Sequence, residues 1–437
     1  MTNRSEIRRW NRIAVRTLAA ATFCIALAAG CVFSDLKREM AEFESTFSLH
    51  GRIEGIARAQ GDVFVLLFAQ KEEGLVLQSY TLPDDTGTYS FFVSPGEYQV
   101  AAFEDRNQNR HHDPGEPAGA WGRPDTIVVS LGEDSRARDE RLADLDFSLE
   151  AGPFPLPEVD SSFEKSTRMS ASLFKLGVLA GWGDPIFDDA HGGTGFWKPL
   201  TFLKQQGIGI YFMQPYQPGK IPILFVHGAS GTPRGWRTLA ESLDRERFQP
   251  WVFYYPSGLR LDQITDALNE MVKRLQLDYG FDRMGVVAHS MGGLVSRGFI
   301  IRHLVEDGLG TVKAFVSIST PWGGVEMAAK GVENAPAAIP SWHDVAPQSD
   351  YIRRIFADPL SPKVPHTLIF GYRGDCSLFM ANNDGTVEVS SELDLRAQDD
   401  AAVVLGLNED HMSILTSKKT ITYLTQALDS AFPQPAP

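Results

Sequence analysis

The sequence predicts an α/β fold, a mostly parallel sheet flanked by helices, preceded by a small all-β sandwich. β-branched and aromatic runs separated by turn residues fill residues 47–150. From residue 205 to residue 432, short apolar runs alternate with amphipathic segments, which is typical of a parallel sheet covered on both faces. The 437 residues, 43% hydrophobic and 22% charged, are enough for two or three globular domains.

Several short strands predict the sandwich over residues 47–150, and they are Val63–Phe68, Tyr89–Val93, Tyr98–Phe103 and Thr126–Val129. Turn residues at 83–87 and 94–97 separate them. The phrases Gly87-Thr88-Tyr89-Ser90-Phe91 and Pro95-Gly96-Glu97-Tyr98-Gln99-Val100 resemble the prealbumin-like domains of exported bacterial proteins. An unrelated β hairpin could carry the same residues, and that alternative stays open.

A linker and helical segment is expected over residues 151–204. It begins with the proline-rich stretch Gly152–Pro157, and an apolar helix follows at about residues 162–179. The strands of the large domain are expected at 221–226, 248–255, 284–288, 312–319, 367–371 and 402–406. Helices are expected between and after them, at 235–243, 261–277, 292–305 and 420–432. We find no internal repeat.

The N-terminus has the composition of an export signal. Residues 1–30 contain five arginines followed by an apolar run from Thr17 to Gly30, which is short for a membrane span. Leu27-Ala28-Ala29-Gly30-Cys31 resembles the bacterial lipobox, which implies cleavage after residue 30 and lipidation of Cys31. A retained signal anchor with an incidental cysteine is the alternative. Residues 31–46 are expected to be a charged tether, with the sandwich acting as a spacer that lifts the active site off the bilayer.

The charge and the cysteines narrow the location and the partners. The net charge of −14 becomes about −18 without the five arginines and one glutamate of residues 1–30, so the surface would repel nucleic acid. Only Cys376 would remain unmodified, so we expect no intrachain disulfide. By analogy with enterobacterial lipoproteins, Val32 after the lipidated cysteine favours the outer membrane. We therefore expect a protein anchored by lipid in the bacterial cell envelope.

A candidate nucleophile lies between a strand and a helix in the large domain. Ser290 follows the apolar run Met284–His289 directly, and Met291-Gly292-Gly293 opens the next helix. Small residues two places to either side of the serine, Ala288 and Gly292, allow the sharp turn that exposes a nucleophilic hydroxyl. A serine hydroxyl needs a base and an orienting acid to become a good nucleophile.

Two backbone N–H groups are candidates for the oxyanion hole. Val226-His227-Gly228-Ala229 ends an earlier strand and resembles the oxyanion loop of lipases, so the N–H groups of Ala229 and Met291 would bind the oxyanion. We expect His227 and His289 to be structural residues that shape this region.

The acid and the base are sought downstream, because the chain order of this triad is serine, acid, histidine. Asp384, in Asn382-Asn383-Asp384-Gly385, is the candidate acid, and Asp375 is its nearest rival. His411 lies in a loop between the last strand and the last helix and is the candidate base. His366 precedes a strand and His343 lies in an insertion, so both are in poorer positions.

Residues 205–432 resemble the lipase-like α/β-hydrolases, through the turn around Ser290 and through Thr320-Pro321-Trp322-Gly323-Gly324. The resemblance implies a serine esterase or lipase, with lipid or acyl-ester substrates and no catalytic cofactor. Residues 325–359 would form a lid or a fixed roof. An acyltransferase, a thioesterase or an amidase would use the same triad, and a non-catalytic binding protein is a further alternative.

A second candidate site lies in the sandwich. Asp105, Asn107, Asn109, Asp113 and Glu116 occupy the first, third, fifth, ninth and twelfth places of a twelve-residue segment, with the His111 carbonyl at the seventh. This is the spacing of a calcium-binding EF-hand loop, although Arg110 stands where glycine is usual. A structural Ca²⁺ and a metal-free hydrogen-bonded turn both fit the spacing.

Overall fold

The computed structural model describes residues 33–42, 47–56, 59–72, 74–83, 86–93, 96–122, 145–151, 167–168, 174–360, 362–374 and 381–434. The expected export signal, Cys31, the strand expected at Thr126–Val129, Asp375 and Cys376 lie outside these residues. Within them, no helix is both long and apolar enough to cross a bilayer.

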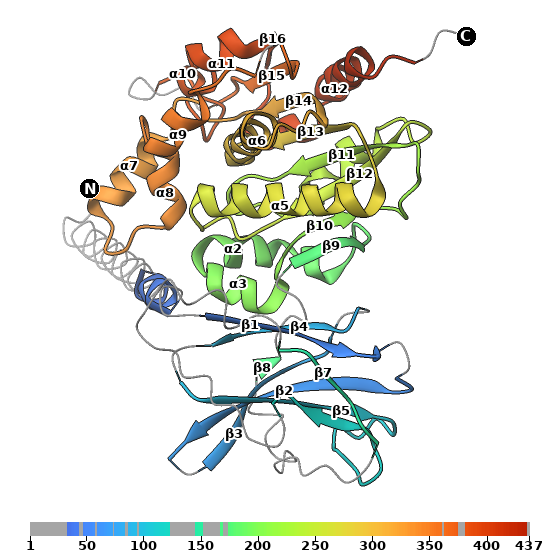
Figure 1. The fold of residues 1–437 in the computed structure, drawn as a ribbon. Helices are drawn as coiled ribbons and strands as arrows, with labels where there is room; N and C mark the ends of the chain where they lie inside the picture. The colour runs from blue at the N-terminus through green and yellow to red at the C-terminus, as the bar shows by residue number, and fades with distance from the viewer. Residues whose placement is uncertain are drawn as a thin grey trace, which may run out of the picture.

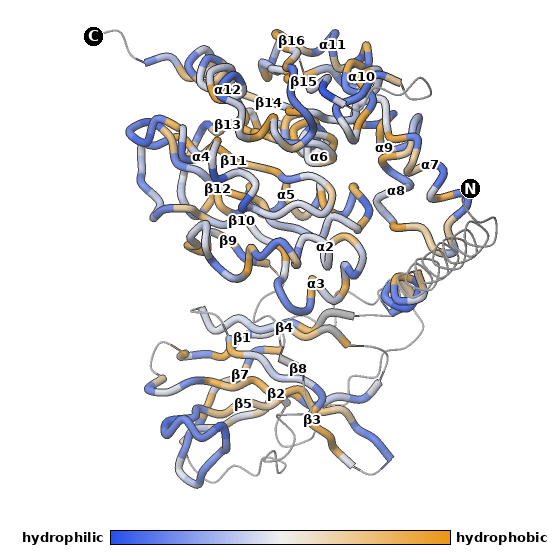
Figure 2. The backbone as a smooth tube through the Cα atoms, turned by 180° about the vertical axis from the view of Figure 1, so that it is seen from behind, coloured by the Kyte–Doolittle hydropathy of each residue, from blue (hydrophilic) through white to orange (hydrophobic). Residues whose placement is uncertain are grey.

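The N-terminal part is a pair of β-sheets (Figure 1). One sheet has the order β4 (Thr88–Val93), β1 (Phe47–Glu54), β7 (Phe147–Ser148). The other has the order β6 (Ala118–Ala120), β5 (Tyr98–Asp105), β2 (Asp62–Lys71), β3 (Gly74–Thr81), β8 (Thr167–Arg168). Hydrophobic residues gather along β2 and β5 (Figure 2), because alternate side chains such as Val65 and Leu67 enter the core. The expected β-rich domain is present, and its likeness to prealbumin stays a prediction.

The second part is built on one eight-stranded sheet, which positions the candidate site. Its order is β16 (Ala401–Leu407), β15 (His366–Gly371), β14 (Val312–Ile318), β13 (Met284–His289), β11 (Ile221–Val226), β12 (Phe248–Tyr254), β10 (Ile208–Phe212), β9 (Phe174–Leu179). Neighbouring strands are parallel except β10 and β12, which are antiparallel. The central strands are buried along their whole length, as the continuous apolar runs predict.

Helices cover both faces of this sheet. On one face, α5 (Leu261–Tyr279) and α6 (Met291–Ile301) share a core with the sheet. On the other face, a second core contains residues of α4 (Arg237–Glu241) and α12 (Lys418–Ala431). Three short helices follow β14 in the expected lid region, and they are α7 (Glu326–Asn334), α8 (Pro340–Val345) and α9 (Asp350–Ile355).

Two sequence predictions near the domain boundary are wrong. The helix expected at about 162–179 is replaced, in its described part, by β8 and β9, and the helices α2 (Asp189–Trp197) and α3 (Pro199–Gln206) follow later. The apolar run forms a strand because it pairs in parallel with β10 at the sheet edge, a contact that local pattern does not reveal. Residues 33–42, expected as a tether, form a helix that contacts α3.

Candidate active site

Ser290 occupies the sharp turn between β13 and α6. Its backbone has φ 54° and ψ −132°, a conformation that L-residues rarely adopt, and it is held by hydrogen bonds from its N–H to Ile318 O (2.9 Å) and from Gly293 N–H to its carbonyl (2.9 Å). A Cβ at Gly292 would lie 2.3 Å from the His227 carbonyl oxygen, so only glycine fits this position. The local sequence therefore fixes the turn that the pattern predicted.

His411 and Asp384 form a buried pair. The His411 Nδ1 lies 2.6 Å from Asp384 Oδ2, and the His411 N–H donates to the Asp384 carbonyl (2.8 Å). The other carboxylate oxygen of Asp384 accepts from the N–H groups of Thr386 (2.9 Å) and Val387 (2.7 Å). Burial alone would raise the pKa of Asp384, but hydrogen bonding to His411 and to these N–H groups outweighs it and lowers the pKa. The ionised carboxylate orients the imidazole with its proton on Nδ1, which leaves Nε2 as an acceptor.

The structure brings the serine, the histidine and the oxyanion-hole candidates to the same place. Ser290, His411 and Ala229 line one cavity of about 600 Å³. Ala229 and Ser290 also line a second cavity of about 450 Å³, together with Met291. Among the described residues, neither the Ala229 N–H nor the Met291 N–H has a hydrogen-bond acceptor, so both are available to an oxyanion.

The neighbouring histidines are packed as structural residues. His227 stacks on Tyr255 with ring centroids 4.2 Å apart, and burial lowers its pKa to about 4. His289 donates from Nε2 to the His411 carbonyl oxygen (2.8 Å), and burial lowers its pKa to about 3. His366 is buried against Ser317, and His343 is exposed on α8. His227 and His289 are thus buried beside Ser290, while neither His366 nor His343 lines the two cavities that contain Ser290.

Sequence reasoning missed Glu392, at the end of α10 (Val389–Glu392). Its side chain is fully buried, and one carboxylate oxygen of Glu392, one of Asp384 and one ring nitrogen of His411 all lie within 4.8 Å of one another. Neither Glu392 oxygen has a partner at good hydrogen-bond geometry, although the Ser319 hydroxyl and the Asp384 carboxylate are near enough to affect its pKa. Burial and then repulsion from Asp384 raise the pKa of Glu392 to about 9, so at neutral pH it is an uncharged acid beneath the pair.

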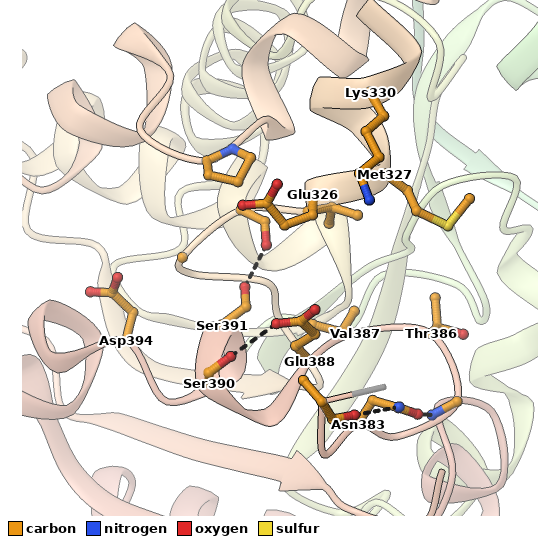
Figure 3. A pocket seen from close by; sticks show the side chains of 16 residues that line it. Glu326, Met327, Lys330, Asn383, Thr386, Val387, Glu388, Ser390, Ser391 and Asp394 are labelled. Atoms are coloured by element: carbon orange, nitrogen blue, oxygen red, sulfur yellow. Dashed lines mark hydrogen bonds between the residues drawn. The ribbon is translucent and has the colours of Figure 1, made fainter. Parts of the chain in front are cut away.

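The second cavity is almost entirely apolar. Its wall contains Phe196, Ala328, Trp342 and Val387, so Ser290 lies between an apolar cavity and the more polar cavity that contains His411. The apolar cavity shares Met327 with a polar one of about 720 Å³, which does not include Ser290 or His411. Figure 3 shows this polar cavity, with Met327, Glu326 and Lys330 contributed by α7, and Ser390 and Ser391 by α10.

In the candidate calcium loop, the carboxylate oxygens accept hydrogen bonds from other residues of the same loop. The two Asp105 oxygens accept from the N–H groups of Asn109 (3.1 Å) and Arg110 (2.8 Å), and the two Glu116 oxygens accept from those of Arg106 (2.7 Å) and Asp113 (3.0 Å). The Asp113 carboxylate accepts from the amides of Asn107 (2.6 Å) and Asn109 (2.7 Å). Arg110, with φ 60°, adopts the conformation for which an EF-hand uses glycine. These hydrogen bonds hold the turn without a metal, and the carboxylate oxygens keep lone pairs for a cation, so the structural Ca²⁺ and the metal-free turn both stay predictions.

A family model supports the same architecture. The family model described as the alpha/beta hydrolase fold matches residues 221–375. A search of curated proteins found no match. Similar solved structures include a Listeria innocua gene product (18% identity, 50% of this chain and 96% of that chain, TM-score 0.38) and a Bacillus licheniformis lipase (17%, 50% and 97%, 0.40). An Aspergillus fumigatus lipase B is 18% identical, over 50% of this chain and 56% of that chain, with TM-score 0.40. The chain has the α/β-hydrolase fold, preceded by a region rich in antiparallel strands.

Proposed function

We propose that the chain is a serine hydrolase that cleaves carboxylic esters of lipids or other acyl compounds through Ser290, His411 and Asp384. The observation that carries the proposal is the 2.6 Å pair of His411 and Asp384, facing the cavity that contains Ser290 on its strained turn. This is the arrangement that nucleophilic catalysis by serine requires.

The chemistry follows from the roles of these groups. His411 Nε2 takes the proton of Ser290 Oγ as Oγ bonds to the ester carbonyl carbon, and the carbonyl oxygen becomes an oxyanion near the N–H groups of Ala229 and Met291. When the intermediate collapses, the bond to the alkoxide breaks and the imidazolium protonates the leaving alcohol. Water then loses a proton to His411 as it bonds to the acyl carbon; the bond from that carbon to Ser290 Oγ breaks, the imidazolium returns its proton to Oγ, and the carboxylic acid is released.

The two cavities beside Ser290 support separate sites for the acyl chain and the leaving alcohol of the ester. The apolar cavity of about 450 Å³ suits an acyl chain, and the more polar cavity of about 600 Å³, which contains His411, suits the leaving alcohol. An acyl ester with an extended hydrocarbon chain is therefore the substrate class that the site favours.

The test is ester turnover and probe labelling by matched variants. Ser290→Ala should abolish both the hydrolysis of p-nitrophenyl esters and labelling by a fluorophosphonate. Ser296→Ala, on the same helix but absent from both cavities, should keep both. Equal turnover by wild type and Ser290→Ala would refute the proposal, and a binding protein would behave in that way.

We also propose that Cys31 carries lipid and anchors the protein in the bacterial cell envelope, with the outer membrane as the expected site. The support is the sequence Leu27-Ala28-Ala29-Gly30-Cys31 after an apolar run. Metabolic labelling with an alkynyl fatty acid should mark the wild type and not Cys31→Ser. Labelling of both proteins, or of neither, would contradict the anchor.

A further inference from the structure

The wall of the apolar cavity begins at the N-terminus of the described chain. Phe33 lines this cavity together with Ser290, Phe196 and Trp342. The Phe33 ring contacts Trp197 edge-on at 5.9 Å, and Trp197 contacts Trp342 in the same way at 6.1 Å. The first described residue is thus part of the aromatic wall of the candidate acyl site.

The helix of residues 33–42 is fixed in this position by contacts with α3 and the residue before it. Lys198 Nζ donates to Asp35 Oδ2 (2.8 Å), the Thr201 N–H donates to Glu39 Oε2 (3.0 Å), and Lys204 pairs with Glu42. The acids at 35, 39 and 42 lie on one face of a helix, opposite a row of partners at 198, 201 and 204. Leu36 is fully buried, and Glu39 is 7% exposed. The helix is therefore docked on the catalytic domain.

The distance from a lipid on Cys31 to this wall is short. Only Val32 separates Cys31 from Phe33, and a fully extended chain spans at most about 7 Å between residues two positions apart. The sandwich begins only at β1, after the docked helix, and Figure 1 shows the blue helix beside α3, above the sandwich. The sandwich therefore does not separate the anchor from the active site, which argues against the spacer role that we expected.

We propose that the apolar cavity beside Ser290 opens onto the membrane that holds the N-terminal lipid, and that its occupant is an acyl chain of a lipid ester from that same membrane. This inference rests on the proposed esterase function and on the proposed anchor. The apolar lining matches a hydrocarbon chain. Met327, which lines the cavity, is 79% exposed and provides an apolar rim where the chain would enter.

The test changes the length between lipid and helix without touching the site. A flexible Gly/Ser linker of about 20 residues, with a root-mean-square length of roughly 25 Å, is inserted between Val32 and Phe33. The control carries the same linker between Glu44 and Ser45, after the docked helix. Each lipidated protein is reconstituted in phosphatidylcholine vesicles that contain a fluorogenic diacylglycerol, and p-nitrophenyl acetate in solution reports the intact catalytic site.

Insertion before Phe33 should lower hydrolysis in the vesicle by about tenfold or more, because a longer tether reduces the effective concentration of the site at the surface. It should leave acetate hydrolysis unchanged, and the control insertion should leave both rates unchanged. Equal vesicle rates for the two insertions would overturn the inference. Failure of the proposed esterase function would give a different result, because the Ser290→Ala variant would then still hydrolyse p-nitrophenyl acetate.

A second measurement tests the inference without an insertion, in case the insertion variants fail to fold. Vesicles made with brominated phosphatidylcholine quench nearby tryptophans, and the lipidated wild type should lose part of its fluorescence in them. The quenched part should disappear in a Trp197→Phe, Trp342→Phe double variant. Quenching that is absent in the wild type, or unchanged in the double variant, would place the cavity away from the bilayer and refute the inference.

Discussion

Replacing Glu392 with glutamine should stabilise the protein in a pH-dependent manner. Glu392 is fully buried beside the ionised Asp384, and burial with this repulsion raises its pKa from 4.5 to about 9. Below pH 4.5 the carboxyl is protonated in both the folded and the unfolded chain. Between pH 4.5 and about 9 the folded chain keeps the proton and the unfolded chain releases it. Wild-type stability therefore falls as pH rises through this window.

The size of the effect follows from the pKa shift. Each pH unit in the window costs the wild type about 1.4 kcal/mol, so about 2.5 units between 4.5 and pH 7 amount to roughly 3.5 kcal/mol. Glutamine has nearly the same shape and does not titrate, so the variant avoids this loss. The difference in unfolding free energy between Glu392→Gln and wild type should grow by about 1.4 kcal/mol per pH unit from pH 5 to pH 8.5.

Urea unfolding at pH 5, 6, 7 and 8.5 measures this difference, and the slope against pH is the quantity to be compared. Any lost or gained contact of the glutamine amide adds a constant, which leaves the slope unchanged. Glu388→Gln is the matched control, because Glu388 lies just before the same short helix and is exposed. A stability difference that does not vary with pH would refute the assignment of Glu392 as a buried neutral acid.

Four further results are expected. Asp384→Asn should lower kcat for p-nitrophenyl butyrate by about 10³- to 10⁴-fold, since the imidazole loses its orienting partner; a fall below tenfold would count against its role as the acid. Ala328→Phe, which narrows the apolar cavity, should reduce the ratio of kcat/KM for p-nitrophenyl octanoate to that for p-nitrophenyl acetate by about tenfold. An unchanged ratio would indicate that the acyl chain binds outside this cavity. Chelation by EGTA should shift Tm by less than about 1 °C if the 105–116 loop is metal-free, and a larger fall in Tm would indicate that the loop binds calcium. Arg297→Met should cost about 3–5 kcal/mol in urea unfolding because it leaves the buried Asp400 carboxylate without its cation.

The triad candidates could be chosen from the sequence because each depends on local order along the chain. The turn at Ser290 needs only an apolar strand, small flanking residues and a helix start, all visible in residues 284–294. Asp384 and His411 follow from the position of loops after late strands, since the carboxyl ends of parallel strands meet at one edge of the sheet. The structure then puts the Asp384 carboxylate 2.6 Å from the imidazole.

The features that were missed depend on tertiary packing rather than on local sequence pattern. Glu392 is one glutamate in an exposed-looking stretch, and only the packing of α10 against the loop of Asp384 buries it. The helix of residues 33–42 has many charged residues, which suggested a tether, but three of its acids meet partners in residues 198–204. The strand β9 likewise exists through its pairing with β10. The partners of the 33–42 helix and of β9 lie more than thirty residues away along the chain, so local sequence pattern gave no signal for these two elements.

Three of the six described non-glycine residues with positive φ lie at the candidate active site. Among the described non-glycine residues with positive φ, Ser290 (54°) and Ser319 (47°) end the adjacent strands β13 and β14, and Ser230 (54°) lies in the loop after β11. Such conformations cost about 1–3 kcal/mol each and persist only where the surroundings impose them. Ser319 is also near Glu392, the buried acid whose pKa is raised. Serines with strained backbones and a buried acid therefore lie at the same edge of the sheet. Such features lower the stability of the fold, and they are expected at functional sites.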